Sequence, residues 1–150
     1  MTNHEISEKA TQIIRHLYGS GAKFRTGQYE AIESVFHHHR TLVVQKTGWG
    51  KSLVYFTATK IKRENGEGVT MVVSPLLVLM ENQEEAGKKL GLKCEMLSSK
   101  TKSRHEDILE QLKHNAIDIV FITPETLFSE KVQQADCPKT IRFWSFFGGL

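Results

Sequence analysis

The sequence predicts an α/β fold in which helices cover both faces of a doubly wound parallel sheet. Continuous apolar runs at residues 69–74 and 117–123 are typical of strands that are buried on both faces. Segments with helical spacing of apolar residues alternate with these runs, and a glycine-rich loop follows a further apolar run at residues 41–44. Such alternation favours a parallel sheet covered by helices.

Two amphipathic helices are expected before the glycine-rich loop. Apolar positions recur at helical spacing over residues 6–17 and stop before a glycine-rich exit, and a second short helix fits residues 28–36. His37, His38 and His39 then follow. Adjacent side chains point in different directions, and no Cys, Asp or Glu stands near them, so a solvated turn is favoured over a metal site.

The later elements continue the alternation. We expect helices at residues 76–90 and 103–114 and a short strand at residues 93–97, with the strand at residues 117–123 following. The run at residues 41–44 is expected to be a buried strand that enters the loop, and a helix is expected to leave the loop. Each predicted strand before residue 117 is therefore followed by a helix.

The octapeptide QKTGWGKS, residues 45–52, matches the end of the Walker A pattern G-x-x-x-x-G-K-S/T. Gly48 and Gly50 have no Cβ atom, so the backbone can turn sharply and aim its N–H groups at phosphate oxygens. Lys51 is placed to reach the β- and γ-phosphates, and Ser52 offers a hydroxyl to Mg²⁺. The loop therefore predicts a site for the phosphates of a nucleotide.

Bulk properties fit a packed intracellular fold. The chain has 150 residues, 39% of them hydrophobic and 25% charged, which is ordinary for one domain. The amino end lacks the blocks of a signal peptide and no apolar run is long enough to span a bilayer, so we expect a cytoplasmic protein without a membrane partner. Cys94 and Cys137 lack the spacing of a disulfide framework or a zinc site.

The formal net charge of +3 permits a polyanionic partner without establishing one. Lys88 and Lys89 stand at the end of a predicted helix, where the helix macrodipole favours cations without any ligand. The loop at residues 98–105 is different, because Lys100, Lys102 and Arg104 crowd it. This loop is a candidate contact for phosphate groups of a nucleic acid.

Two further motifs resemble those of one known family. Residues 24–32, FRTGQYEAI, resemble the pattern F-R-x-x-Q-x-x-x-I, and residues 74–83, SPLLVLMENQ, resemble S-P-L-x-S-L-M-x-D-Q. Together with the phosphate loop they resemble the RecQ-like branch of the superfamily 2 DNA helicases over nearly the whole chain. Family loops also carry a non-Gly residue where Gln45 stands, but Lys46 and Trp49 replace the usual Pro and Gly.

This resemblance implies a RecA-like ATP-binding fold with ATP and Mg²⁺ as cofactors. It implies that Gln28 reads the adenine edge and Arg25 flanks the nucleotide, with Lys51 as the catalytic residue and Ser52 on Mg²⁺. The nucleotide-binding residues carried over are Phe24, Arg25, Gln28, Thr47, Gly48, Trp49, Gly50, Lys51 and Ser52.

The resemblance also implies a partner, single-stranded or partially duplex DNA. Its contacts fall at two strand-to-helix junctions, where N–H groups and small hydroxyls can hold phosphates without reading sequence. These residues are Ser74, Pro75, Leu76, Thr123, Pro124 and Glu125. A plain helix start with Pro at its first position would give the same Thr-Pro-Glu tripeptide, and that alternative stays open.

One family motif is missing. Superfamily 2 enzymes use an Asp-Glu pair to hold Mg²⁺ and orient water, and this sequence has no Asp-Glu dipeptide. We therefore expect residues 1–150 to form one C-terminally truncated RecA-like domain, with a helical segment at residues 1–37 and a second RecA-like domain missing in cis or in trans. Apolar surface at Val43 and Ile119 should then be exposed, which predicts poor solubility.

Three functions remain open at this point. The leading one is the N-terminal fragment of a RecQ-type, ATP-dependent DNA helicase with 3′ to 5′ polarity, inactive as an isolated chain. The alternatives are an inactive module that binds nucleotide or nucleic acid, or half of a split protein, and a different P-loop enzyme such as a small-molecule kinase.

Overall fold

A computed structural model describes residues 1–38, 40–135 and 142–145, the last of these by their backbone. The chain divides into two compact units, a helical unit in Met1–Asn65 and a sheet unit in the described residues from Gly66 onward. No helix among the described residues is long and apolar enough to cross a bilayer.

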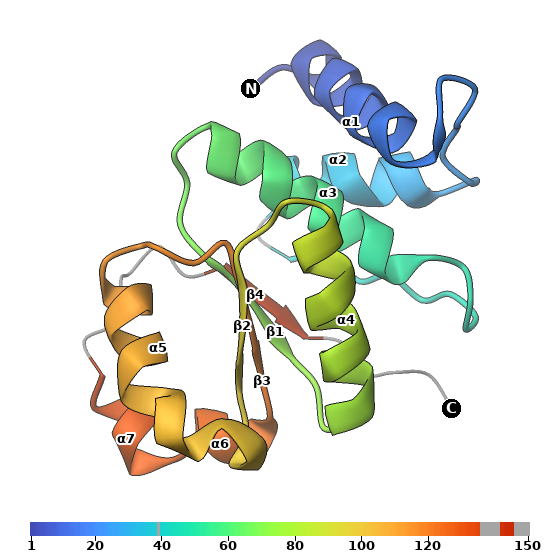
Figure 1. Ribbon diagram of the computed structural model, residues 1–150. Helices are drawn as coiled ribbons and strands as arrows, with labels where there is room; N and C mark the ends of the chain where they lie inside the picture. The colour runs from blue at the N-terminus through green and yellow to red at the C-terminus, as the bar shows by residue number, and fades with distance from the viewer. Residues whose placement is uncertain (39, 136–141, 146–150) are drawn as a thin grey trace. The chain divides into compact units, whose positions relative to one another are not determined.

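The helical unit consists of α1 (Asn3–Tyr18), α2 (Gln28–His37) and α3 (Lys51–Glu64) (Figure 1). A capping box starts α1, since the Thr2 hydroxyl accepts from the Glu5 N–H while the Glu5 carboxylate accepts from the Thr2 N–H. The apolar stripe of α1 contributes Ala10 and Ile13 to a core that also contains Ile61 of α3. Burial of this stripe fixes how the three helices pack within the unit.

The sheet unit has four strands, all paired in parallel, in the order β2-β3-β1-β4. Crossover helices connect the strands, because parallel neighbours cannot be joined by a tight turn. The elements, in chain order, are β1 (Thr70–Val73), α4 (Leu77–Lys89), β2 (Cys94–Leu97), the 3-10 helix η1 (Ser99–Arg104), α5 (His105–Lys113), β3 (Ile119–Ile122), α6 (Pro124–Leu127), α7 (Glu130–Gln133) and β4 (Arg142–Ser145).

Both faces of the sheet are apolar. Val120 and Ile122 of the central strand β3 pack with Ile108 and Leu112 of α5, and side chains alternate along a strand, so Ile119 and Phe121 lie on the opposite face. Figure 1 shows the strands between α5 and α4. Every residue of β3 is buried, as expected of a strand that is covered on both faces.

The structure confirms the predicted fold class. Apart from the strand expected at residues 41–44, the expected helices and strands occur with boundaries that shift by a few residues. The 3-10 helix η1 occupies most of the expected loop at residues 98–105 and the start of the helix expected at residues 103–114. The short elements α7 and β4 were not predicted, and α6 corresponds to the helix start with Pro124 at its first position that was left open as an alternative. Four residues give too little periodicity for the apolar pattern to identify an element.

The prediction of a buried strand at residues 41–44 is wrong. These residues form no strand, and the side chains of Leu42 and Val44 are 89% and 79% exposed. An extended segment becomes a strand only when a neighbour pairs with its backbone, and the described strand pairs join β1 with β3, β1 with β4 and β2 with β3 only.

The prediction that Ile119 would be exposed is also wrong. Ile119 is fully buried, because β3 pairs with β1 on one side and β2 on the other, and helices cover the two faces of the sheet. Val43, the other residue expected at the surface, is half-buried. The exposed apolar side chains of the described residues include Leu42, Val44, Val78 and Phe128.

Candidate functional site

A cavity of about 740 Å³ opens in the helical unit between the end of α1 and the residues that precede α3. Arg25 and Gln28 line it from one segment, and Gly48, Gly50 and Ser52 line it from the glycine-rich loop. The fold therefore brings together five of the nine residues predicted for nucleotide binding. The cavity falls in the size range of small-molecule and cofactor sites.

The loop at residues 45–50 depends on its glycines. Gly48 and Gly50 have φ angles of +80° and +96°, which residues with a Cβ atom rarely adopt. A Cβ atom on Gly50 would lie 2.6 Å from Gln28 Nε2, so no other residue fits without moving that side chain. Gly50 is also the N-cap residue of α3, whose first turn holds no acidic residue. The partial positive charge of this helix start is therefore available to an anion.

Side-chain hydrogen bonds tie the loop to residues 24–28. Arg25 Nη1 donates to Gly48 O at 2.6 Å, and Gln28 Nε2 donates to Trp49 O at 2.9 Å. Gln28 Oε1 in turn accepts from the Arg25 N–H at 2.8 Å. Gln28 is only 3% exposed, so its amide is a buried bridge between the two segments.

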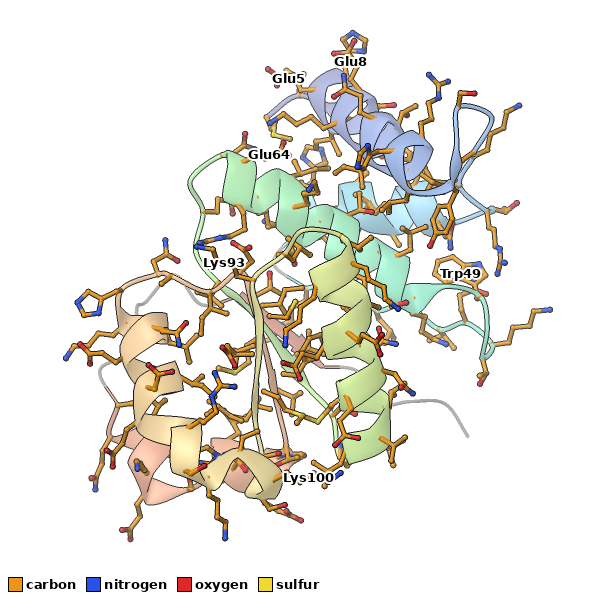
Figure 2. The ribbon with its side chains drawn as sticks, viewed as in Figure 1. Glu5, Glu8, Trp49, Glu64, Lys93 and Lys100 are labelled. Carbon is orange, nitrogen blue, oxygen red and sulfur yellow. The ribbon has the colours of Figure 1, made fainter. Side chains whose placement is uncertain are left out.

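The sequence predicted no contact within the protein for the side chain of Trp49. Its side chain is 8% exposed, and Nε1 donates to Thr26 O at 3.2 Å. Figure 2 shows Trp49 beside the start of α3. The only sequence signal was a Trp where the family pattern has Gly, which does not specify a partner. Thr26 stands 23 residues earlier, and only the fold brings the two together.

Lys51 and Ser52 occupy the first turn of α3, where their side chains can reach an anion held at the helix start. Lys51 Nζ donates to Lys46 O at 3.1 Å, so the ammonium is held back over its own loop. Phe24 does not line the cavity: it packs, partly buried, against the core of the helical unit, with its ring centroid 6.4 Å from that of Tyr29.

The donor set fits a magnesium ion only in part. Ser52 supplies a hydroxyl oxygen of the kind Mg²⁺ accepts, and nucleotide phosphates would supply further oxygens. Among the described residues, no group of three His, Cys, Asp or Glu could hold a metal ion by itself. His39 and Cys137 lie outside the described residues. A metal at this loop would therefore depend on the nucleotide for most of its ligands.

The carboxyl edge of the sheet collects a second set of predicted residues. Ser74, Ser98 and Thr123 follow β1, β2 and β3, which are neighbours in the sheet, and all three are buried. The structure thus brings Ser74 and Thr123 to one edge and adds Ser98, which begins the charged loop and belongs to residues 97–99, a segment that resembles a further motif of the family. Pro75, Leu76 and Glu125 are exposed beside them, and Pro124 is half-buried.

The hydroxyls at this edge are engaged locally. Ser74 Oγ accepts from the Leu76 N–H at 3.3 Å, and Ser98 Oγ accepts from the Lys100 N–H at 3.3 Å. Thr123 Oγ1 accepts from the Thr126 N–H at 3.4 Å, with Pro124 at the first position of α6. The helix-start interpretation of Thr-Pro-Glu is therefore correct for the structure, and any ligand role would be additional.

Most cations near this edge already have carboxylate partners. Lys100 Nζ lies 2.6 Å from Glu81 Oε1, and Arg104 Nη2 lies 2.8 Å from Glu95 Oε1. The hydrogen bond from Glu95 raises the pKa of the Arg104 guanidinium. Figure 2 shows Lys100 at one end of the sheet unit. These pairs reduce the positive charge that the segment 98–105 would offer to phosphate groups, which weakens the prediction made for it.

Cys94 is a buried thiol in β2 without a reactive environment. Burial raises its pKa to about 12, so the thiol stays protonated near neutral pH. The thiolate is the reactive form, which means that Cys94 fits a packing role. The other cysteine, Cys137, lies outside the described residues.

Comparison with known proteins identifies similar sequences. Residues 25–143 match the DEAD/DEAH box helicase family. The chain is 34% identical over 122 residues to the ATP-dependent DNA helicase RecQ of Synechocystis sp., covering 81% of this chain and 24% of that protein. It is 37% identical over 124 residues to the Bacillus subtilis ATP-dependent DNA helicase RecQ, covering 81% and 20%. The chain thus spans about a quarter or less of these relatives.

A solved structure supports the same fold. The SWI2/SNF2 ATPase core of Sulfolobus solfataricus, solved in complex with dsDNA, superposes with a TM-score of 0.56 at 22% sequence identity. The match covers 77% of this chain and 25% of that chain. At this identity the likeness concerns the arrangement of helices and strands.

Proposed function

Because the chain belongs to the DEAD/DEAH box helicase family, we propose that it binds ATP with Mg²⁺ and forms part of a RecQ-type, ATP-dependent DNA helicase. One observation carries this proposal. The cavity of about 740 Å³ is lined both by the phosphate loop and by Arg25 and Gln28, so phosphates and base can be bound at the same time. The RecQ relatives, which are named ATP-dependent DNA helicases, support it.

The phosphates bind at the start of α3 in this proposal. The N–H groups around Gly48 and Gly50 and the ammonium of Lys51 neutralise them, and Thr47 and Trp49 complete the loop. Ser52 binds the Mg²⁺ ion, which neutralises charge on the phosphate oxygens when bound. Lys51 must release Lys46 O to reach the β- and γ-phosphates, a movement of one flexible side chain.

The base and ribose bind toward Phe24, Arg25 and Gln28. The Gln28 amide has two donor hydrogens and two acceptor sites, and its internal hydrogen bonds leave capacity at the oxygen for a base edge. The Arg25 guanidinium has five N–H donors, of which one is bonded to Gly48 O. Both side chains can therefore keep their contacts with the loop and also bind nucleotide.

We propose that single-stranded or partially duplex DNA binds along the carboxyl edge of the sheet. The residues assigned to this contact are Ser74, Pro75, Leu76, Thr123, Pro124 and Glu125. N–H groups near these helix starts would bind phosphates and would not read sequence. The buried hydroxyls of Ser74 and Thr123 shape the turns that present those groups.

Turnover requires parts beyond the described residues. We propose that residues 1–150 supply the ATP-binding half, and that a second RecA-like domain in cis or in trans supplies an arginine finger, which contributes about 10³ to 10⁵ in rate in related enzymes. Closure of the two domains on ATP would move DNA, with a 3′ to 5′ polarity suggested by the family resemblance alone.

A second candidate is a module that binds nucleotide or nucleic acid without hydrolysis, or half of a split protein. The placement of the aspartates favours it, since the sequence contains only Asp107, Asp118 and Asp136. Asp107 bonds Gln111 within α5, and Asp118 accepts from the Lys93 N–H just before β3. Neither of these two is placed at the carboxyl edge of a strand, where a metal-binding acid would be needed, and Asp136 lies outside the residues that the structure describes.

Replacing Lys51 with Ala tests the proposed nucleotide site. Loss of the ammonium should abolish measurable Mg²⁺-ATP binding in isothermal titration calorimetry, because no other side chain of α3's first turn carries positive charge. The matched control is Lys113→Ala, which removes the same charge from an exposed position of α5. Equal ATP affinity in Lys51→Ala and the unmodified chain would contradict the assignment.

DNA-stimulated hydrolysis of ATP by a longer chain would distinguish a helicase from a small-molecule kinase, because a kinase would show no dependence on DNA.

A further inference from the structure

The phosphate loop contains a large aromatic side chain at a position where the family pattern has Gly. An indole ring that projected from the loop toward the ligand would obstruct the close approach of the backbone to the phosphates. Trp49 is instead 8% exposed, and its single side-chain donor is satisfied by Thr26 O at 3.2 Å. Gly27 lies against the indole, since a Cβ atom there would be 3.5 Å from the ring. The indole is thus docked on residues 26–27.

The backbone of Trp49 is fixed on the same side. Its carbonyl oxygen accepts from Gln28 Nε2 at 2.9 Å, and the preceding carbonyl, Gly48 O, accepts from Arg25 Nη1 at 2.6 Å. Two consecutive carbonyls of the loop therefore point at residues 25–28. In a trans peptide the C=O and N–H vectors are antiparallel, so the N–H of Gly50 points away from Gln28.

This orientation matters because the two ends of a peptide group have opposite effects on a phosphate. A carbonyl that faced the phosphates would repel them, whereas an N–H would donate to them. Gly48 and Gly50 have positive φ angles and can flip their peptides with little steric resistance. The loop thus needs an external constraint to keep its carbonyls turned away.

We propose that Trp49 is a positioning residue, a latch that docks the phosphate loop on residues 25–28 and sets its peptide orientation before nucleotide binds. The inference rests on the proposed ATP site and adds the residue that preorganises it. Gln28 and Arg25 hold the two carbonyls, and the indole keeps the loop close enough for them to do so. Apparent affinity falls in proportion to the fraction of molecules whose loop is docked.

The substitution that isolates the latch is Trp49→Phe. It keeps an aromatic ring in the loop, removes the N–H that donates to Thr26 O, and shortens the ring whose far end lies against Gly27. Loss of about 1 kcal/mol of net hydrogen bonding lowers the ratio of docked to undocked loops about fivefold, and this is the upper limit of the drop in affinity that the lost bond causes. Because the latch acts on the phosphate loop, calorimetry should give the same drop for Mg²⁺-ATP and for inorganic tripolyphosphate. Trp49→Gly, which restores the family residue, should weaken both by more.

The second tryptophan gives both a control and a spectroscopic readout. Trp144→Phe makes the same chemical change outside the helical unit and should leave both affinities unchanged. In that variant Trp49 is the only indole. Before nucleotide is added, its emission should be blue-shifted and poorly quenched by acrylamide. Mg²⁺-ATP should change it little, because the latch is already closed.

Three results would count against the proposal in different ways. Binding by Trp49→Phe as tight as by the unmodified chain would overturn the role of Trp49 and leave the ATP site standing. Emission that moves from exposed to buried when ATP binds would overturn preorganisation. Absence of binding of either ligand to the unmodified chain would overturn the proposed function and, with it, this role. Should Trp49→Gly fail to fold, Trp49→Phe and the emission measurement decide the question.

Discussion

The phosphate loop and the carboxyl edge of the sheet are both strand-end or helix-start regions rich in small polar residues, but they are built in opposite ways. Hydrogen bonds in the loop join residues far apart in sequence, as Arg25 and Gly48 or Gln28 and Trp49 do. At the sheet edge, Ser74 and Thr123 bond N–H groups two or three residues later. One region is held by tertiary contacts and the other by local capping.

This difference separates two kinds of polar residue that look alike in a sequence. A buried side chain that links distant segments, such as Gln28, constrains the shape of a site. When that side chain is removed, the two segments lose their relative position and the site loses its geometry. A hydroxyl that caps the next turn stabilises a helix start wherever it occurs. The phosphate loop is therefore the better supported of the two candidate sites.

The largest expected effect tests the sheet that supports the capped edge. Phe121 of β3 is fully buried, so Phe121→Ala should lower the free energy of unfolding by about 3–5 kcal/mol through lost apolar contacts and a residual cavity. Urea denaturation followed by circular dichroism measures this change. Phe128→Ala is the matched control, since Phe128 is 76% exposed and its loss should change stability by less than about 0.5 kcal/mol. Similar losses in the two variants would contradict the assigned burial.

The next effect concerns the tertiary contacts of the loop. Gly50→Ala adds a Cβ atom 2.6 Å from Gln28 Nε2 at a φ of +96°, so it should break the bond from Gln28 to Trp49 O and weaken Mg²⁺-ATP binding about tenfold or more. Calorimetric titration gives the affinity. Gly91→Ala introduces a comparable backbone strain at a φ of +76° with nothing within 4 Å, and it should bind ATP normally. If both variants bound ATP equally well, close approach at Gly50 would have no role.

The smallest effect tests local capping. Thr123→Val removes the hydroxyl that accepts from the Thr126 N–H and should lower the free energy of unfolding by about 1 kcal/mol. Thr57→Val is the control, because Thr57 Oγ1 is buried and has no hydrogen-bond partner among the described residues. That variant should be neutral or stabilising in urea denaturation, since no bond is lost and a buried polar group is removed. An equal loss in both variants would argue against the cap.

Some features of the fold could be predicted from the sequence because they depend on local pattern. The apolar run that became β3 and the helical spacing that became α1 report burial directly, and the structure confirms both. The run at residues 41–44 has the same character but forms no strand, because pairing depends on a partner that composition does not reveal. Leu42 and Val44 of that run are also exposed, so an apolar run predicts a buried strand only where its backbone finds a pairing partner.

The site shows the same limit. Its glycines, Lys51 and Ser52 could be named from spacing alone, because phosphate binding demands particular residue types in a fixed order. Their roles, and those of the other residues carried over from the resemblance, stay predictions. Spacing could not reveal that Gln28 bonds Trp49 O, or that Lys51 rests on Lys46 O. Those contacts depend on which segments the folded chain brings close together in space.

The sequence by itself determined the fold class and the family, and it predicted the residues of the phosphate loop, since periodicity and motif spacing act over a few residues. Only the tertiary structure decided that Trp49 is buried with its indole N–H bonded to Thr26 O. It also decided that the Gln28 amide bridges residues 24–28 and the phosphate loop. The tertiary structure also showed that the hydroxyls of Ser74 and Ser98 at the sheet edge accept hydrogen bonds from N–H groups two residues later in the chain. The physical reason is that hydrogen bonds and packing depend on distance in space, and a linear pattern fixes distance only between near neighbours.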